Sequence, residues 1–155
     1  APRLVAEVAS EHGSQRPAAP PARRVVSAET AASVRDMLTR VVVDGTARRA
    51  LVPSYDIAAK TGTAQKPQDG GGYTDRFGAY HYVATVAGFF PSDHPEFSMI
   101  VVLDEPSPEI YASRVSAPLF GELAAWTLRH YQVSPETDLV FEEASSVLRE
   151  GEGEQ

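Results

Sequence analysis

The sequence contains no cysteine and begins with Ala-Pro-Arg rather than methionine. The absence of cysteine excludes disulfides, thiol catalysis and thiolate metal sites, and it leaves the redox compartment open. No apolar run approaches the roughly 20 residues that a membrane-spanning helix needs. No signal-peptide pattern is present either. The chain therefore has the features of a processed or cut piece, and we expect any targeting segment upstream.

Positive charge is scarce, with 14 Lys and Arg against 21 Asp and Glu and a net charge of -7. This balance argues against a nucleic-acid binder, which normally has a basic face. The doublets Arg23-Arg24 and Arg48-Arg49 have no interleaved aromatics, so we interpret them as solvated surface. The length of 155 residues and the hydrophobic fraction of 43% suit one domain with its own core.

The pattern of the N-terminal third predicts a short strand over residues 3–9, a turn at 12–14 and a proline-rich connector at 17–21. A helix follows, with Ser27 as its N-cap and Asp44-Gly45 as its end. Its apolar residues form one stripe and are Val34, Met37, Leu38, Val41 and Val42. We interpret Met37 and Leu38 as core packing rather than cofactor contacts.

Three strands are predicted at about 55–63, 82–90 and 97–103. The short connection between the last two indicates antiparallel neighbours. The middle strand is apolar on both faces, which is typical of a central strand covered on both sides. Between the first two strands, residues 66–80 contain three consecutive glycines, and we expect a long, mobile hairpin loop at the mouth of the site.

A last helix is predicted past Pro106 and Pro108, with its end near Tyr131 and with Pro118 tolerated only in its first turn. Its predicted apolar stripe consists of Val115, Leu119, Leu123 and Trp126. The order of elements predicts an α+β fold, an antiparallel sheet flanked by helices. We assign residues 1–135 to this domain and residues 136–155 to an acidic, flexible tail.

The stretch most informative about chemistry is Lys60-Thr61-Gly62-Thr63, at the end of the first predicted strand. Strand alternation places Lys60 and Gly62 on one face, and Thr61 and Thr63 on the other. Glycine in a strand often marks the close approach of a ligand or another backbone. An edge strand with these groups suits an extended peptide that ends in a carboxylate. Lys-Thr-Gly alone also fits an ordinary strand end with an exposed lysine.

The chain resembles the class B penicillin-binding proteins, the monofunctional transpeptidases of cell division and elongation. The resemblance spans about residues 3–135 and implies the penicillin-binding and serine β-lactamase-like fold. The stretches that carry it are Val25–Ala31, Ile57–Pro67, His81–Pro91, Ile100–Pro106 and Ser116–Phe120. Of the family's three motifs, Ser-x-x-Lys, Ser-x-Asn and Lys-Thr-Gly, only the last is present. In the family the other two precede this strand, so truncation explains their absence better than degeneration.

The resemblance implies a function for the whole protein. A serine from the missing Ser-x-x-Lys attacks the D-Ala-D-Ala bond of a peptidoglycan stem peptide, and an amine of a second stem peptide resolves the acyl-enzyme. Lys60 would supply positive potential and assist proton movement, and Thr61 and Thr63 would hydrogen-bond the substrate carboxylate. The Thr63 N–H would be one oxyanion donor, and Gly62 would leave room for the substrate. The chain alone is predicted to be inactive.

The resemblance also implies partners and a location. They are the stem peptide, β-lactam antibiotics, the upstream part of the domain with Ser-x-x-Lys and Ser-x-Asn, and a glycosyltransferase partner of the full-length protein. No cofactor, metal or nucleic acid is implied. The location would be the extracytoplasmic face of the bacterial inner membrane, with an upstream anchor. A serine β-lactamase, a β-lactam sensor and a non-catalytic interaction module remain as alternatives.

Other polar residues give weaker signals. His12, His81, His94 and His130 lack metal-ligand spacing, so we interpret them as surface or satisfied core residues. Asp104 and Glu105 are adjacent on an extended chain, so their side chains are expected on opposite faces, without a joint role. Ser113 and Arg114 would lie near the site only if the last helix packed beside the strand with Lys60.

Overall fold

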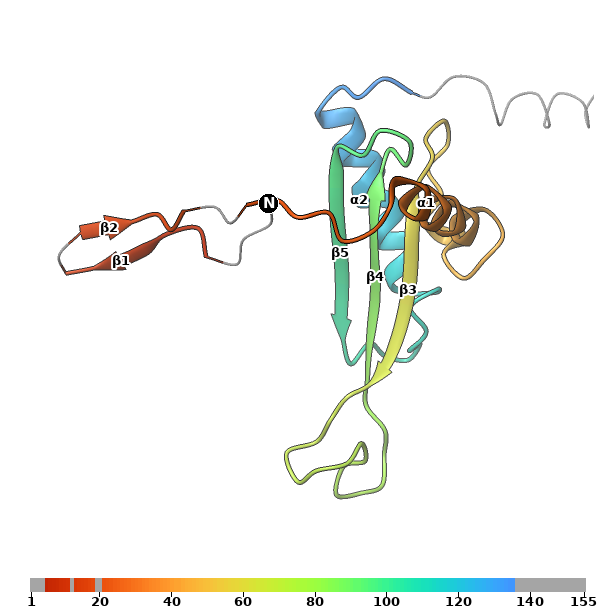
Figure 1. Ribbon diagram of the computed structural model, residues 1–155. Helices are drawn as coiled ribbons and strands as arrows, with labels where there is room; N and C mark the ends of the chain where they lie inside the picture. The colour runs from red at the N-terminus through yellow and green to blue at the C-terminus, as the bar shows by residue number, and fades with distance from the viewer. Residues whose placement is uncertain (1–4, 12, 19–20, 136–155) are drawn as a thin grey trace, which may run out of the picture. The chain divides into compact units, whose positions relative to one another are not determined.

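The computed structural model describes residues 5–11, 13–18 and 21–135. The chain forms two compact units, residues 1–32 and 33–155. The predicted tail over 136–155 lies outside the described residues. The second unit contains a three-stranded sheet with one helix packed along it (Figure 1).

The first unit contains a small hairpin rather than one strand and a turn. Strand β1 (Val8–Ser10) pairs antiparallel with β2 (Gly13–Gln15). The predicted turn at 12–14 is wrong at its last two residues, because Gly13 and Ser14 belong to β2, and of the strand predicted over 3–9 the described residues place only Val8 and Ala9 in β1. Gly13 has a φ of +123°, which favours glycine because it lacks a Cβ.

Helix α1 (Ala28–Val43) begins and ends where the sequence predicts. The Ser27 Oγ accepts a hydrogen bond from the Thr30 N–H at 3.0 Å, which confirms the N-cap. The interpretation of Met37 as core is wrong, because 63% of it is exposed. Only Val42 of α1 is buried, and within the described part of the chain Val34 and Met37 of the apolar stripe are exposed.

The sheet consists of β3 (Ala58–Gln65), β4 (Tyr82–Phe90) and β5 (Phe97–Asp104), in the order β3-β4-β5 and antiparallel throughout. The bounds of β4 are those predicted, whereas β3 begins three residues later than predicted and runs two residues further. The predicted α+β class is confirmed.

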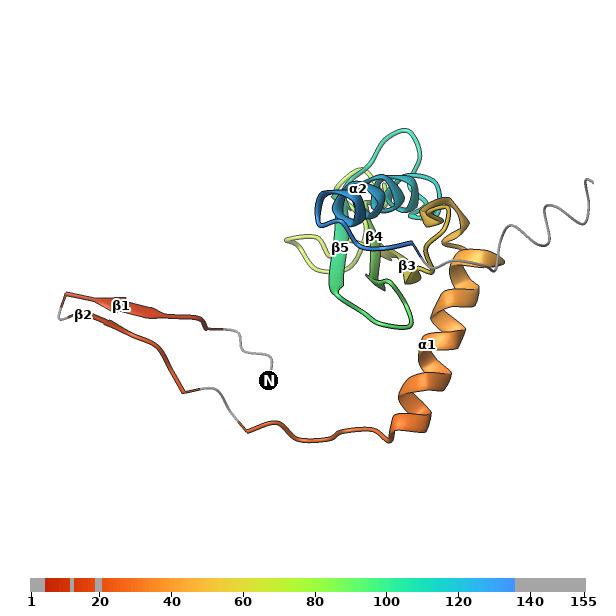
Figure 2. The same ribbon diagram turned by 90° about the horizontal axis from the view of Figure 1, so that it is seen from above.

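Helix α2 (Ser116–His130) covers one face of this sheet (Figure 2). Pro118 lies in its first turn, as predicted. The predicted apolar stripe is wrong, because Leu119, Leu123 and Trp126 are 36%, 41% and 56% exposed. The helix instead buries Ala117, Phe120, Gly121, Ala124 and Leu128. The small residues among these, Ala117, Gly121 and Ala124, let α2 approach closely, and a Cβ on Gly121 would lie 3.1 Å from the Arg49 carbonyl oxygen.

The opposite face of the sheet is open within the described residues. On β4, Ala84 and Val86 are buried beneath α2, whereas Ala87 on the other face is exposed. On β5, Ile100 and Val102 are 63% and 53% exposed. The expectation that β4 is covered on both sides is therefore not met by this part of the chain.

Candidate active-site edge

Strand β3 has one free edge among the described residues, because it pairs only with β4. The Lys66 N–H, just past β3, donates to the His81 carbonyl oxygen at 2.8 Å. Backbone groups of an antiparallel strand alternate between its two sides. The N–H groups of Thr61 and Thr63 therefore point away from β4, towards the free edge. The Lys60 Nζ donates to the Thr61 carbonyl oxygen at 2.8 Å, which fits a carbonyl outside the ladder.

The two threonine hydroxyls contact segments far from β3 in the sequence. The Oγ1 atoms of Thr61 and Thr46 lie 2.7 Å apart, and the Ala112 N–H donates to the Thr63 Oγ1 at 3.1 Å. A hydroxyl has one hydrogen to donate and two lone pairs to accept with. Since the Thr63 Oγ1 accepts here, its own hydrogen is left to donate to a ligand.

Gly62 faces open space, and a Cβ built on it would meet no atom within 4 Å. Lys60 and Gly62 are both exposed. The packing of this chain therefore does not demand glycine at this position, although the approach of a ligand backbone would. The edge as a whole is accessible.

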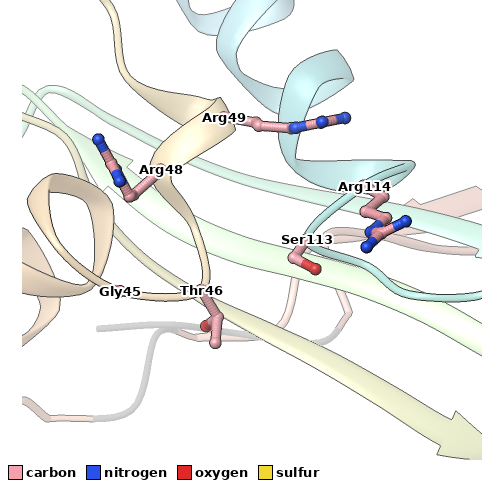
Figure 3. Close-up of a pocket in the computed structure, with 6 residues that line it drawn as sticks. All are labelled: Gly45, Thr46, Arg48, Arg49, Ser113 and Arg114. Atoms are coloured by element: carbon pink, nitrogen blue, oxygen red, sulfur yellow. The ribbon is translucent and has the colours of Figure 1, made fainter.

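A cavity of about 480 Å³ lies beside β3 (Figure 3). We call it the basic pocket, and its lining residues are Gly45, Thr46, Arg48, Arg49, Ser113 and Arg114. Arg48 and Arg49 belong to the short helix η1 (Arg48–Ala50). Ser113 and Arg114 are expected near the site only if α2 packs beside β3. Helix α2, however, packs on η1, β4 and β5. The turn before α2 reaches β3 instead, through Ala112.

A charged network joins the two ends of the β3–β4 loop to the end of β5. The Lys66 Nζ lies 2.8 Å from the Asp104 Oδ2 and 2.8 Å from the Glu105 Oε1. The expectation that Asp104 and Glu105 point apart is therefore wrong, because β5 ends at Asp104 and Glu105 takes a left-handed φ of +52°. His81 bridges Glu105 at 3.1 Å and Asp75 at 3.3 Å.

This network shifts the protonation of its members. Hydrogen bonds to Asp75 and then Glu105 raise the pKa of His81 above its ordinary value. Hydrogen bonds from Lys66 and then His81 lower the pKa of Glu105. The loop tip is also organised, because the Asp75 Oδ1 accepts from the N–H groups of Phe77 and Ala79 at 2.8 and 2.9 Å. The mobility of this loop stays a prediction.

Within the ranges that the structure describes, no group of three or more His, Cys, Asp or Glu side chains is placed to hold a metal ion. Over the same ranges, no helix combines the length and apolar character needed to cross a membrane.

Residues 1–125 match the family model of the penicillin-binding protein transpeptidase domain. The chain belongs to this family. It is 32% identical over 135 residues to peptidoglycan D,D-transpeptidase FtsI of Escherichia coli, which is 86% of this chain and 22% of that protein. It is 39% identical over 121 residues to penicillin-binding protein PbpB of Mycolicibacterium smegmatis, which is 71% of this chain and 18% of that protein. The chain thus spans about a fifth of these relatives.

Solved structures of the family are similar in fold. Penicillin-binding protein 3 of Mycobacterium tuberculosis, complexed with ampicillin, matches with a TM-score of 0.66 and 32% identity. The match covers 88% of this chain and 32% of that one. The transpeptidase domain of penicillin-binding protein 3 from Burkholderia pseudomallei matches with a TM-score of 0.63 and 37% identity, over 80% and 36% of the two chains. The resemblance to class B penicillin-binding proteins is confirmed.

Proposed function

We propose that this chain supplies the Lys-Thr-Gly wall of a peptidoglycan D,D-transpeptidase site that forms a serine acyl-enzyme and is acylated by β-lactams. The observation that carries the proposal is the free edge of β3, where the Thr63 N–H points outward beside two threonine hydroxyls. The ampicillin and aztreonam complexes of the Mycobacterium tuberculosis relative support β-lactams as ligands.

The proposed roles follow from the chemistry of each group. The Thr63 N–H donates to the oxyanion that forms on the attacked carbonyl, and loss of one such donor costs about 2.7–4 kcal/mol in acyl transfer. The Thr61 and Thr63 hydroxyls donate to the terminal carboxylate of the stem peptide. Lys60 adds positive potential at the same edge. Gly62 leaves space for the backbone of the extended peptide.

The nucleophile belongs to a segment N-terminal to this chain in the proposed whole protein. That segment would carry Ser-x-x-Lys and Ser-x-Asn and cover the open face of the sheet, where Ile100 and Val102 are exposed. We place the whole protein at the extracytoplasmic face of the bacterial inner membrane, with a glycosyltransferase as partner. A role in division and a role in elongation are equally compatible with this proposal.

Labelling with a fluorescent penicillin tests whether the nucleophile lies in the upstream segment while this chain supplies the Lys-Thr-Gly strand. We expect no covalent label on this chain alone, because the serine motif is absent, and stable label on the longer polypeptide that includes that motif. In the longer polypeptide, Lys60→Ala should slow labelling at least tenfold without lowering the melting temperature, whereas Lys66→Ala, outside the edge, should not slow it.

Two outcomes would contradict this proposal. A covalent label on the chain alone would show that the nucleophile lies within it. Labelling of the longer polypeptide followed by rapid hydrolysis of the acyl-enzyme would favour the β-lactamase alternative instead.

A further inference from the structure

The basic pocket concentrates positive charge on a chain whose net charge is -7. Three of its six lining residues are arginines, and none of the six has an apolar side chain. Figure 3 shows the arginines arriving from two segments, Arg48 and Arg49 from η1 and Arg114 from the turn before α2. A ligand that fills this cavity must therefore be polar, and an anionic group fits it best.

One of the three arginines is already neutralised. The Arg114 Nη1 lies 3.1 Å from the Glu109 Oε2. The hydrogen bond from the Tyr111 N–H, and then the positive charge of Arg114, lower the pKa of Glu109, so this carboxylate stays ionised. Over the described residues, no carboxylate forms an ion pair with Arg48 or Arg49. Two guanidinium groups are thus available to a ligand.

The pocket adjoins β3 through Thr46. Thr46 lines the pocket, and its hydroxyl lies 2.7 Å from that of Thr61, a proposed contact of the substrate carboxylate. A peptide bound along this edge therefore lies next to the pocket. The guanidinium fork of an arginine matches the planar geometry of a carboxylate. Figure 3 shows Arg49 extending towards the side of Arg114 and Arg48 extending the opposite way, so the binding of one carboxylate by both arginines requires rotation of these exposed side chains.

We propose that the basic pocket binds a second, internal carboxylate of the peptide whose terminal carboxylate is held by Thr61 and Thr63. The transpeptidase substrate is then an acidic peptide, and Arg48 and Arg49 set the preference for it. This inference rests on the proposed function. Since both arginines are exposed, the preference should be about fivefold, the upper end for an exposed ion pair.

The test uses the longer polypeptide with the serine motif and two peptides ending in D-Ala-D-Ala. One peptide has a free internal carboxylate, and in the other this group is an amide. We expect kcat/KM for release of D-alanine to be about fivefold higher for the acidic peptide. The double variant Arg48→Gln/Arg49→Gln should abolish this preference and leave the rate of penicillin labelling unchanged. Arg48→Lys/Arg49→Lys should retain part of the preference, because the charge remains but the planar fork is lost.

Arg129→Gln is the matched control, since it removes one positive charge at the far end of α2. That helix has 15 residues and is about 22 Å long, more than two Debye lengths at physiological ionic strength. The control should keep the preference. Two results would contradict the proposed role of the pocket while penicillin labelling still supports the proposed function. One is equal kcat/KM of the unsubstituted polypeptide for the acidic and the amidated peptide. The other is a loss of preference in Arg129→Gln as large as that in Arg48→Gln/Arg49→Gln. Absence of penicillin labelling from the unsubstituted polypeptide would overturn the proposed function, and this inference with it.

Discussion

Gly62 and Gly88 lie on neighbouring strands, β3 and β4, and glycine is needed at the two positions for different reasons. A Cβ on Gly88 would lie 2.4 Å from the Ala58 carbonyl oxygen and 2.8 Å from the Ala59 Cβ, both on the paired strand. A Cβ on Gly62 would meet nothing within 4 Å. Packing of the chain therefore requires glycine at position 88, and the ligand is the only reason proposed for glycine at position 62.

Single substitutions of the two glycines distinguish the packing requirement at position 88 from the ligand requirement at position 62. We expect Gly88→Ala to lower the free energy of unfolding of this chain by about 1–3 kcal/mol, because a strand must shift to admit the methyl group. Gly62→Ala should leave stability unchanged or slightly raise it, since glycine is weak in a strand. Urea denaturation measures both, and equal destabilisation would contradict this assignment. In the longer polypeptide, Gly62→Val should slow penicillin labelling.

At the scale of an element, the contacts of His81 stabilise the conformation of the β3–β4 loop. Contacts with Asp75 and Glu105 raise the pKa of His81 above its unfolded value, and Lys66 shares Glu105. The resulting stabilisation of the loop is fully present below the unfolded pKa of about 6.5. It is lost as the pH rises through the raised folded pKa.

We therefore expect the backbone amides of the loop to lose protection from hydrogen exchange as the pH rises through the raised pKa of His81, beyond the intrinsic increase in exchange. His81→Gln should remove this dependence. His94→Gln, which deletes an exposed histidine of the β4–β5 connection, should preserve it. The titration of the His81 ring, followed by NMR, gives the pKa directly, and a value at or below 6.5 would refute the argument.

Local sequence signals predicted the elements better than their burial. The Ser27 cap and the bounds of β4 follow from short-range chemistry, and the structure confirms them. Periodicity placed Leu123 and Trp126 inward, yet α2 buries a neighbouring stripe that contains Phe120, Ala124 and Leu128, because that side of the helix packs on the sheet and η1. The contact between Thr46 and Thr61 spans 15 residues, and the pairing of Ala112 with Thr63 spans 49. No spacing rule predicts such contacts, since tertiary packing creates them.

At the scale of the whole molecule, the sheet has one face covered by α2 and one face open within the described residues. Ile100 and Val102 on the open face are β-branched and exposed, although such residues are usually buried in a central sheet. The chain spans only about a fifth of the two sequence relatives reported above, and its match to the solved structure of the Mycobacterium tuberculosis protein covers 32% of that chain. The open face is therefore where the proposed upstream segment would pack.

The effect of one substitution on the free energy of unfolding, compared between the isolated chain and the longer polypeptide, tests whether the open face is covered in the longer protein. In the isolated chain, Ile100→Asp should change the free energy of unfolding by less than about 0.5 kcal/mol, as for other exposed sites. In the longer polypeptide the same substitution would bury an unpaired charge and should destabilise the domain by several kcal/mol. Phe120→Ala is the control, because Phe120 of α2 is fully buried against the sheet in this chain, and it should cost about 3–5 kcal/mol in both polypeptides. If Ile100→Asp were equally harmless in both, the open face would remain solvent-exposed in the longer protein, and the upstream segment would have to reach β3 from another side.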